Sequence, residues 1–197
     1  MKIRLASSNK DKAREFHELL DGRFEILSAT LPKGVEIAET GMTFSENAIQ
    51  KAEGYAAYYP EDWILAEDSG LSVDLLDGAP GIYSSRYGGE GLDYPGKFRK
   101  LWQELREKSE DPGDWTAQFV SELALRSPDG ELYTYRGECS GHIILEARGE
   151  GGFGYDPIFY VQELDKTFGE LSDEMKNELS HRANAVAAWL KDWEDEV

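Results

Sequence analysis

The sequence predicts an α/β fold with a mixed β-sheet. Three patterns indicate it: a strand, turn and helix at the N-terminus, a buried strand after a long amphipathic helix, and a hairpin in the middle of the chain. Alternating strands and helices are typical of parallel pairing, and a hairpin adds antiparallel pairing. The 197 residues are 40% hydrophobic and 12% aromatic, enough for the core of one domain or of two closely packed lobes. We therefore treat residues 1–197 as a single domain.

The first strand and helix are predicted from a change of hydrophobic period. Lys2 to Ala6 alternates polar and apolar side chains, as a half-buried strand does. A polar turn, Ser7-Ser8-Asn9, follows, and apolar side chains then recur at helical spacing at Ala13, Phe16 and Leu20. This part of the chain is expected to form a strand, a turn and a helix.

The next two elements are a helix and a buried strand. Thr43 and Glu46 form a capping box that starts the helix, which ends before Pro60. The apolar run from Trp63 to Ala66 breaks into Glu67-Asp68-Ser69-Gly70, which predicts a buried strand with carboxylates at its carboxyl end. The helix places its apolar side chains on one face: Phe44, Ala48, Ala52, Tyr55 and Tyr59.

The second half of the chain contributes a loop, two helices and the hairpin. Residues 78–91 are rich in glycine and are expected to form a loop. The turn 127–130 joins an alternating strand, residues 117–125, to an aromatic strand around Tyr133 and Tyr135. The helix after the loop is predicted from Phe98, Leu101, Trp102 and Leu105. The last helix, capped by Ser180, is predicted to bury Ala183, Val186, Ala187, Leu190 and Trp193.

Charge and composition exclude several classes of protein. Lys and Arg number 21 and Asp and Glu 39, so the formal net charge is −18, which opposes binding of extended DNA or RNA. No apolar run approaches the roughly 18 residues that a membrane span needs, and the N-terminus lacks a long apolar signal segment. The single cysteine, Cys139, cannot form an internal disulfide. We expect a cytoplasmic protein whose acidic surface serves solubility, with adaptation to high salt as a weaker alternative.

A first candidate site lies between the first strand and the first helix. Amides at a helix start, small hydroxyls and a lysine one turn into the helix can together hold phosphate. An ordinary helix cap with a solvated lysine is the alternative interpretation. The residues of this segment are Ser7, Ser8, Asn9, Lys10, Asp11 and Lys12.

A second candidate site consists of carboxylates. Glu67 and Asp68 follow the buried strand, and Glu39 is a possible third acid from the preceding loop. Adjacent residues of an extended segment point to opposite faces, so Glu67 and Asp68 should not both ligate one ion unless the chain bends, which Gly70 permits. Mg²⁺ needs only one or two carboxylates in addition to substrate phosphates, with Mn²⁺ as an alternative ion. A polar turn without function is the other interpretation.

Two further segments have the chemistry of a base site. Residues 151–157 place Phe153 and Tyr155 among glycines, so that the backbone can approach a flat ligand and a ring can stack on a base. A tight turn with packed aromatic rings is the alternative. His181 and Arg182 begin the last helix, where the positive end of the helix dipole disfavours cations and an acceptor would explain them. A lone histidine, however, is more often structural.

These segments together resemble the inosine triphosphate pyrophosphatase family, which hydrolyses non-standard purine nucleoside triphosphates. No single match is decisive, but seven in the family's order are far more specific than one glycine motif. The matching runs are Ser7-x-Asn9-x-x-Lys12, Glu39-x-Gly41-x-Thr43-Phe44-x-Glu46-Asn47-Ala48, Lys51-Ala52, Glu67-Asp68-Ser69-Gly70-Leu71, residues 78–87 (Gly-Ala-Pro-Gly-Ile-Tyr-Ser-Ser-Arg-Tyr), residues 151–159 and Ser180-His181-Arg182.

The resemblance implies an elongated mixed sheet flanked by helices, two lobes around a central substrate cleft, and a homodimer. It implies that the triphosphate is held by the segment from Ser7 to Lys12, with Lys51 and Lys176 as further cationic contacts. It implies that Asp68 is the proton acceptor and a metal ligand, Glu39 a second acid at the ion, and Glu67 a neighbour that positions water or metal. The resemblance implies that Ser69 touches the substrate. It implies further that Phe153, Gly154, Tyr155 and Asp156 enclose the base and that His181 and Arg182 read its edge.

The expected reaction is the hydrolysis of ITP, dITP or XTP to the monophosphate and pyrophosphate. A carboxylate of ordinary pKa can serve as the base if a metal ion acidifies the attacking water. Groups at His181 and Arg182 would donate hydrogen bonds to the 6-keto oxygen of hypoxanthine or xanthine. With adenine they would face the 6-amino group, which is itself a donor, so adenine would be rejected. The family pattern fits poorly over residues 88–97, and many relatives carry two aspartates at Glu67-Asp68.

Two other functions are compatible with the same sequence. One is a pyrophosphatase for modified or pyrimidine nucleoside triphosphates on a similar scaffold. The other is a nucleotide-binding module without catalysis, which the presence of Asp68, Glu39 and the three lysines Lys12, Lys51 and Lys176 disfavours. A substrate panel with and without metal separates these alternatives.

Overall fold

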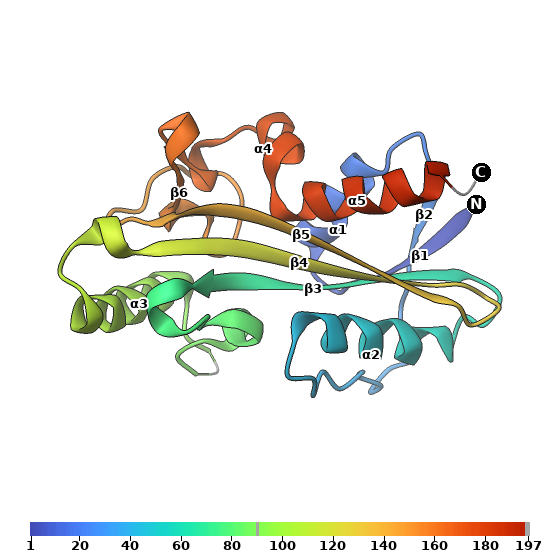
Figure 1. Ribbon diagram of the computed structural model, residues 1–197. Helices are drawn as coiled ribbons and strands as arrows, with labels where there is room; N and C mark the ends of the chain where they lie inside the picture. The colour runs from blue at the N-terminus through green and yellow to red at the C-terminus, as the bar shows by residue number, and fades with distance from the viewer. Residues whose placement is uncertain (90, 196–197) are drawn as a thin grey trace. The chain divides into compact units, whose positions relative to one another are not determined.

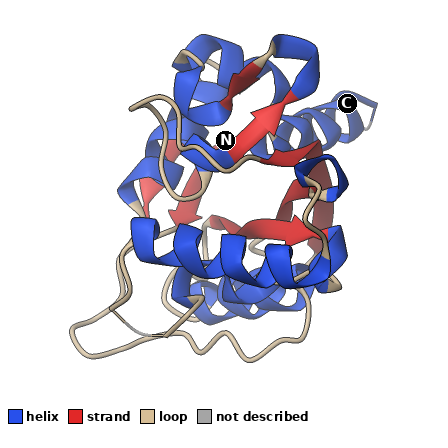
Figure 2. Cartoon of the chain, turned by 90° about the vertical axis from the view of Figure 1, so that its left-hand side faces the viewer, coloured by secondary structure: helices blue, strands red, loops and turns tan. Residues whose placement is uncertain are grey.

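The computed structural model describes residues 1–89 and 91–195 as a mixed α/β protein (Figure 1). Strands and helices alternate along most of the chain, and Figure 2 shows both kinds of element. The strands are β1 (Lys2–Ala6), β2 (Glu25–Ser28), β3 (Trp63–Val73), β4 (Thr116–Arg126), β5 (Leu132–Ile143), β6 (Phe159–Val161) and β7 (Lys166–Thr167). The α-helices are α1 (Lys10–Leu19), α2 (Phe44–Ala56), α3 (Tyr94–Lys108), α4 (Asp173–Leu179) and α5 (His181–Asp195).

The strands form one seven-stranded sheet in the order β2-β1-β3-β4-β5-β6-β7. β1 pairs in parallel with β2 and with β3, whereas β6 pairs antiparallel with β5 and with β7. The turn between β4 and β5 is closed by backbone hydrogen bonds between Ser127 and Glu131 and between Gly130 and Ser127. The predicted mixed sheet and hairpin are therefore confirmed.

The chain divides into two compact units. Unit 1 comprises Met1–Asp68, Ser121–Gly137 and Arg182–Val197, and unit 2 comprises Ser69–Val120 and Glu138–His181. This division agrees with the two lobes predicted from the sequence. The cleft between them stays a prediction, as does the single-domain range 1–197, in which residues 90, 196 and 197 lie outside the described part.

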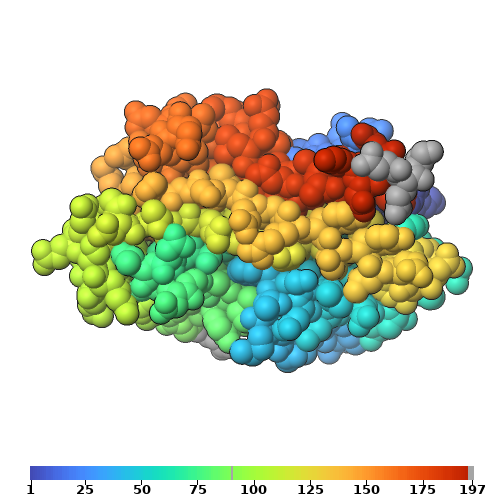
Figure 3. Space-filling view, viewed as in Figure 1, coloured from blue at the N-terminus to red at the C-terminus, as the bar shows by residue number. Residues whose placement is uncertain are grey.

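Unit 1 has one apolar cluster on each face of its strands. Phe16 of α1 and Trp189 of α5 pack with Leu5, Leu65 and Leu123 of the strands. The opposite cluster is built from small residues, with Ala48 and Ala52 of α2 against Ala6, Ala66 and Ala124. Accordingly, α1 and α5 lie on one side of these strands and α2 on the other in Figure 1. α2 also presents a side to the molecular surface (Figure 3). Glu53 is one of the exposed residues of this helix.

Unit 2 has its own core around α3 and the aromatic side chains of the strands. Phe98 and Leu101 of α3 are buried there, and the rings of Phe119, Phe159 and Phe168 pack against one another with centroid distances of 4.5 to 5.5 Å. Trp115 is fully buried in the same cluster. This core holds the turns that follow β5, in which several of the predicted site residues lie.

Two predictions of local structure were wrong. The strand predicted to end at Ala66 runs on through Glu67 and Asp68 to Val73 as β3, because both acids are buried and compensated by partners in the fold. On α5, Ala187 is exposed, whereas the other predicted positions of the stripe, Ala183, Val186, Leu190 and Trp193, are buried or packed against the core, and Ala185 and Trp189 are buried with them. The predicted helix start at Thr43 is confirmed, since its side chain accepts from the amide of Glu46.

Within residues 1–89 and 91–195, no helix has both the length and the apolar character needed to cross a membrane.

Candidate active site

The register of β1 and β3 places the predicted phosphate segment beside the carboxylates. Ala6 is paired with Ala66 in the parallel ladder. β1 ends there, so Ser7 leaves the sheet next to the point where β3 continues into Glu67 and Asp68. Glu67 and Asp68 thus lie in the middle of β3, next to the carboxyl end of the neighbouring strand β1. Ligands of α/β proteins bind at the carboxyl ends of the parallel strands.

The start of α1 is capped by its own side chains. Asn9 accepts hydrogen bonds through Oδ1 from the amides of Asp11 (2.9 Å) and Lys12 (3.2 Å), and Ser7 Oγ accepts from the amide of Asn9. The sequence predicted free amides at this helix start, and the structure corrects that prediction for these three donors. An anion bound here would meet mainly the hydroxyls and the ammonium groups of Lys10 and Lys12.

Glu67 lies on the face of the sheet that α1 and α5 cover, and its carboxylate is surrounded by donors. Lys12 Nζ is 2.9 Å from Oε2, and Ser121 Oγ donates to Oε1 at 3.0 Å. Arg182 Nε and Nη2 lie 3.0 and 2.8 Å from Oε1. Arg182 also pairs with Glu15, so two carboxylates and two cations are grouped on this face. Lys12 is therefore an ion-pair partner of Glu67 and not a solvated helix residue.

Asp68 lies on the opposite face, against α2. Asn47 Nδ2 donates to Asp68 Oδ2 at 3.0 Å. Lys51, one turn along α2, donates to the backbone oxygen of Glu67 at 2.9 Å and pairs with Glu39 at 3.1 Å. The predicted divergence of Glu67 and Asp68 to opposite faces is thus what β3 shows, because no bend interrupts the strand.

The two groups of side chains differ in charge. Glu67, Glu15, Lys12 and Arg182 balance to zero, whereas Asp68, Glu39 and Lys51 together carry a net negative charge. Burial raises the pKa of Asp68 above its ordinary value, and Glu39 adds to the rise, against the opposing effect of the Asn47 hydrogen bond and of Lys12 and Lys51. A cation placed on the α2 face would relieve this excess of negative charge.

The three predicted metal ligands, Glu39, Glu67 and Asp68, are not brought together in the structure. Among the described residues, no three His, Cys, Asp or Glu side chains are grouped so as to hold a metal ion. Glu67 points away from the other two acids and is occupied by Lys12 and Arg182, so the three predicted ligands do not form one set. Asp68 and Glu39 share the net negative face, and two carboxylates together with substrate phosphates suit Mg²⁺.

The predicted base segment is a tight turn in unit 2. Asp156 Oδ2 accepts from the amide of Phe153 and from Lys176 Nζ, both at 2.7 Å. Lys176 is only 3% exposed, and its ammonium lies 4.8 Å from the centre of the Phe153 ring. Gly152 has φ +69°, and a Cβ there would lie 2.1 Å from Asp156 Oδ2, so glycine is required. Lys176, predicted as a phosphate contact, is therefore grouped with the base segment.

The remaining predicted residues are divided between the units. His181 is 5% exposed and stacks on Phe119 in unit 2, with centroids 4.9 Å apart and an interplanar angle of 17°. Arg182 is 1% exposed and belongs to unit 1, where it pairs with the two glutamates. Ser69 begins unit 2 and is half-buried, whereas Gly154 and Tyr155 follow Phe153 in the turn. The roles of these residues toward a base stay predictions.

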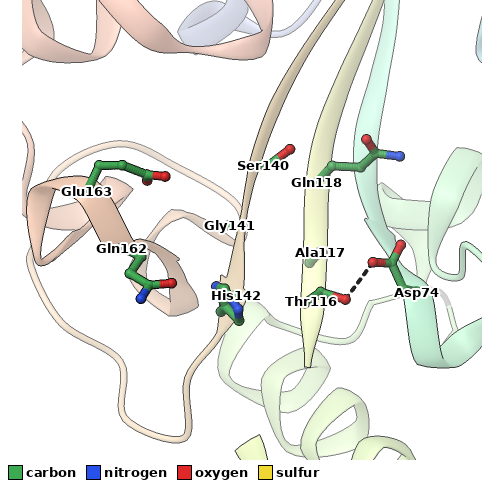
Figure 4. Close-up of a pocket in the computed structure, with 9 residues that line it drawn as sticks. All are labelled: Asp74, Thr116, Ala117, Gln118, Ser140, Gly141, His142, Gln162 and Glu163. Atoms are coloured by element: carbon green, nitrogen blue, oxygen red, sulfur yellow. Dashed lines mark hydrogen bonds between the residues drawn. The ribbon is translucent and has the colours of Figure 1, made fainter. Parts of the chain in front are cut away.

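Unit 2 also contains a pocket that the sequence did not indicate. Its volume is about 300 Å³, and polar side chains line it, including His142, Gln118, Ser140 and Glu163 (Figure 4). Asp74 at its edge accepts a hydrogen bond from Thr116. Within the described part of the chain, none of the residues predicted for the active site lines this pocket.

Three residues of the candidate site were missed. Glu15 and Asn47 are polar residues on buried helix faces, and Ser121 is a fully buried residue of β4. Their signal in the sequence is a polar side chain at a position where the helical or strand period demands an apolar one. Such a residue needs a buried partner, and the sequence does not say which.

The comparisons with known proteins identify the family of the chain. A family model for the Ham1 family matches residues 3–192. The chain belongs to the Ham1 family. A protein of Desulforamulus reducens named dITP/XTP pyrophosphatase is 45% identical to this chain over 188 residues, which cover 94% of this chain and 92% of the relative. A protein of Bacillus subtilis with the same name is 45% identical over 184 residues, which cover 92% of this chain and 91% of the relative. The structure of a Ham1 protein from Coxiella burnetii superimposes on this chain with a TM-score of 0.87 and 37% sequence identity, and the match covers 100% of each chain. The resemblance to the pyrophosphatase family and the α/β fold are confirmed.

Proposed function

We propose that this protein hydrolyses non-standard purine nucleoside triphosphates, such as ITP, dITP and XTP, to the monophosphate and pyrophosphate. The observation that carries the proposal is the buried Asp68, whose carboxylate sits beside Glu39 and Lys51 on a net negative face. The names of the relatives, dITP/XTP pyrophosphatase, support the same substrates.

In the proposed reaction, a water oxygen bonds to the α-phosphorus while the bond from that phosphorus to the bridging oxygen breaks. Asp68 takes the proton of the water, and pyrophosphate leaves with the electron pair of the broken bond. A carboxylate with a raised pKa is a stronger base than an ordinary aspartate, which suits this task.

Metal dependence is part of the proposal. Asp68 and Glu39 would hold the ion, Mg²⁺ or alternatively Mn²⁺, together with phosphate oxygens of the substrate. When bound, the ion would acidify the attacking water and neutralise charge on the leaving pyrophosphate. Lys51 would hold Glu39 in place through the ion pair that it already makes. Glu67 would position Lys12 and Arg182 and would not contact the ion.

The base would lie against the turn of unit 2 that contains Phe153 and Asp156. Lys176 holds that turn through Asp156, and the Phe153 ring offers a face for stacking. Recognition of the 6-keto group by His181 and Arg182 is supported by the family resemblance, although the donors of Arg182 face carboxylates in this structure. A homodimer and a cytoplasmic location are proposed on the same resemblance, and light scattering of the purified chain tests the dimer.

The deciding experiment is pyrophosphate release from ITP, XTP, dITP, GTP, ATP and a modified pyrimidine triphosphate, with Mg²⁺ and with EDTA. We expect turnover of the first three to exceed that of ATP by roughly 10⁴-fold, since a buried donor is left unpaired by the wrong base. Chelation should abolish it. Comparable rates with the pyrimidine nucleotide would favour the alternative pyrophosphatase, and binding without release would favour a non-catalytic module.

Lys12→Ala should raise KM and lower kcat together. Its ammonium is held at 2.9 Å from Glu67 Oε2, at the start of α1. A lysine that contacts the leaving phosphates would bind them more strongly as charge develops, so both constants should change, with a loss of about 10-fold or more in kcat/KM. Lys2→Ala, an exposed cation of β1, serves as the control. An unchanged kcat/KM would limit Lys12 to its ion pair.

A further inference from the structure

Asn47 is a buried polar residue that joins two parts of the candidate site. It lies on α2 with 1% of its surface exposed. Its Nδ2 donates to Asp68 Oδ2 at 3.0 Å, and its Oδ1 accepts from the amide of Gly41 at 2.8 Å. Gly41 lies two residues after Glu39, so one amide side chain connects the base proposed for the reaction with the loop of the second acid.

The loop comes close enough for this only because residue 41 is glycine. A Cβ on Gly41 would lie 2.6 Å from the Cβ of Glu46 and 2.8 Å from Asn47 Oδ1. Glu46 fixes the next residue as well, because its carboxylate accepts from the amide of Met42. The first turn of α2 therefore holds the Glu39 loop through backbone donors.

The hydrogen bonds leave one orientation for the Asn47 amide. The Gly41 N–H can only donate, so the atom facing it has to be the oxygen, Oδ1. The NH₂ group then faces Asp68, and it too can only donate. With the two ends exchanged, the NH₂ group would face the Gly41 N–H and two donors would meet. The Gly41 amide thus fixes which end of Asn47 reaches Asp68.

This arrangement restrains the Asp68 carboxylate. Oδ2 has to be an acceptor toward Asn47, whose own orientation is fixed by the amide of Gly41. A carboxylate whose rotation is restrained presents its lone pairs in a fixed direction, which is what a base needs in order to meet a water in line with the bond to be broken.

We propose that Asn47 is a positioning residue for the reaction: held by the Gly41 amide, it donates to Oδ2 of Asp68 and so sets the direction in which the Asp68 carboxylate meets the attacking water. This inference rests on the proposed function, because it assigns an orientation to the base of that reaction. It explains why a helix otherwise lined with Ala48, Ala52 and Ala56 buries an asparagine.

A purely structural role would be to tie the Glu39 loop to α2, and the chain provides a matched residue for that role. Gln50 lies on the same helix and accepts from the amide of Thr40 at 2.9 Å. It fastens the same loop through the backbone and hydroxyl of Thr40, whereas Asn47 reaches both the loop and Asp68. Gln50→Glu adds the same charge through the same NH₂-to-oxygen change as Asn47→Asp, and it keeps the acceptor for Thr40.

The test compares Asn47→Asp, Asn47→Leu and Gln50→Glu with the wild type in pyrophosphate release from ITP with Mg²⁺. Asn47→Asp retains the acceptor for Gly41 but turns a second carboxylate toward Asp68 Oδ2, and like charges at this distance cannot both ionise. Asn47→Leu removes the donor without adding charge. We expect kcat to fall about 10²-fold in both Asn47 variants with KM within a few-fold of the wild type, as for a misplaced reacting group. Gln50→Glu should keep the wild-type kcat.

Melting temperatures are measured in parallel. An Asn47 variant that folds and keeps the wild-type kcat overturns the proposal, and so does an equal loss of kcat in Gln50→Glu. A rise in KM with kcat unchanged also overturns it, because the residue would then only tether the loop. If Asn47→Leu does not fold, the kinetics of Asn47→Asp decide between these outcomes. A wild-type chain that releases no pyrophosphate contradicts the proposed function, and that result is separate from the variant comparison.

Discussion

Asp68→Asn should abolish turnover while nucleotide binding persists. The substitution keeps the size of the side chain and an acceptor for Asn47, but it removes the proton acceptor and one negative charge beside Glu39. Loss of a general base costs about 10² to 10⁴ in kcat, and weaker metal binding adds to this. The measurement is pyrophosphate release from ITP with Mg²⁺, with nucleotide binding followed by calorimetry. Rates close to those of the wild type would remove Asp68 from the mechanism.

The pH dependence provides a second test of Asp68. Burial raises its pKa above the ordinary value, so as pH falls the carboxylate is protonated earlier than in an exposed aspartate. Because the reaction needs the ionised form, kcat/KM should fall with decreasing pH, and a metal ion bound at Asp68 should move this acidic limb to lower pH than burial alone would place it. Asp62, which is half-buried and paired with Arg4, provides a control, since Asp62→Asn should leave this acidic limb in place.

Arg182→Met should have the largest effect on stability. The guanidinium is 1% exposed and lies between Glu15 and Glu67, so its removal takes away the cation that both buried carboxylates share. Breaking a buried ion pair by deleting one partner costs about 3–5 kcal/mol in the free energy of unfolding. Urea unfolding of the variant measures it. Lys191→Met, an exposed cation on the same helix, should change the value by less than about 0.5 kcal/mol.

A double variant tests whether the loss arises from the stranded charge. Glu15→Gln in the Arg182→Met background removes one of the two carboxylates and should restore part of the stability, whereas Glu15→Gln alone should destabilise the protein. Additive losses would show that Arg182 acts by packing. In the same variants, the ratio of kcat/KM for ITP and ATP shows whether Arg182 also reads the 6-keto group, for which a fall of about one to two decades is expected.

Elements that depend on local patterns could be predicted from the sequence. The start of α2 at Thr43, the hairpin of β4 and β5 and the helix α5 after Ser180 all follow from caps, periods and turn residues that are read within a few positions. The strand β3 was predicted too short, because charged residues normally end a buried strand. Its continuation through Glu67 and Asp68 depends on partners as distant in sequence as Arg182.

The candidate site divides in the same way. Its chemical types could be read from the chain, namely the acids Glu67 and Asp68, the lysines Lys12 and Lys51 and the glycine-rich turn, because the order and spacing of motifs are properties of the sequence. Their pairing could not, since it depends on how the helices pack on the sheet. β3 places adjacent side chains on opposite faces, and the helices on each face determine what they meet: Lys12 and Arg182 for Glu67, and Asn47 for Asp68. The charge balance of each face is a sum over residues far apart in sequence that come together only when the chain has folded.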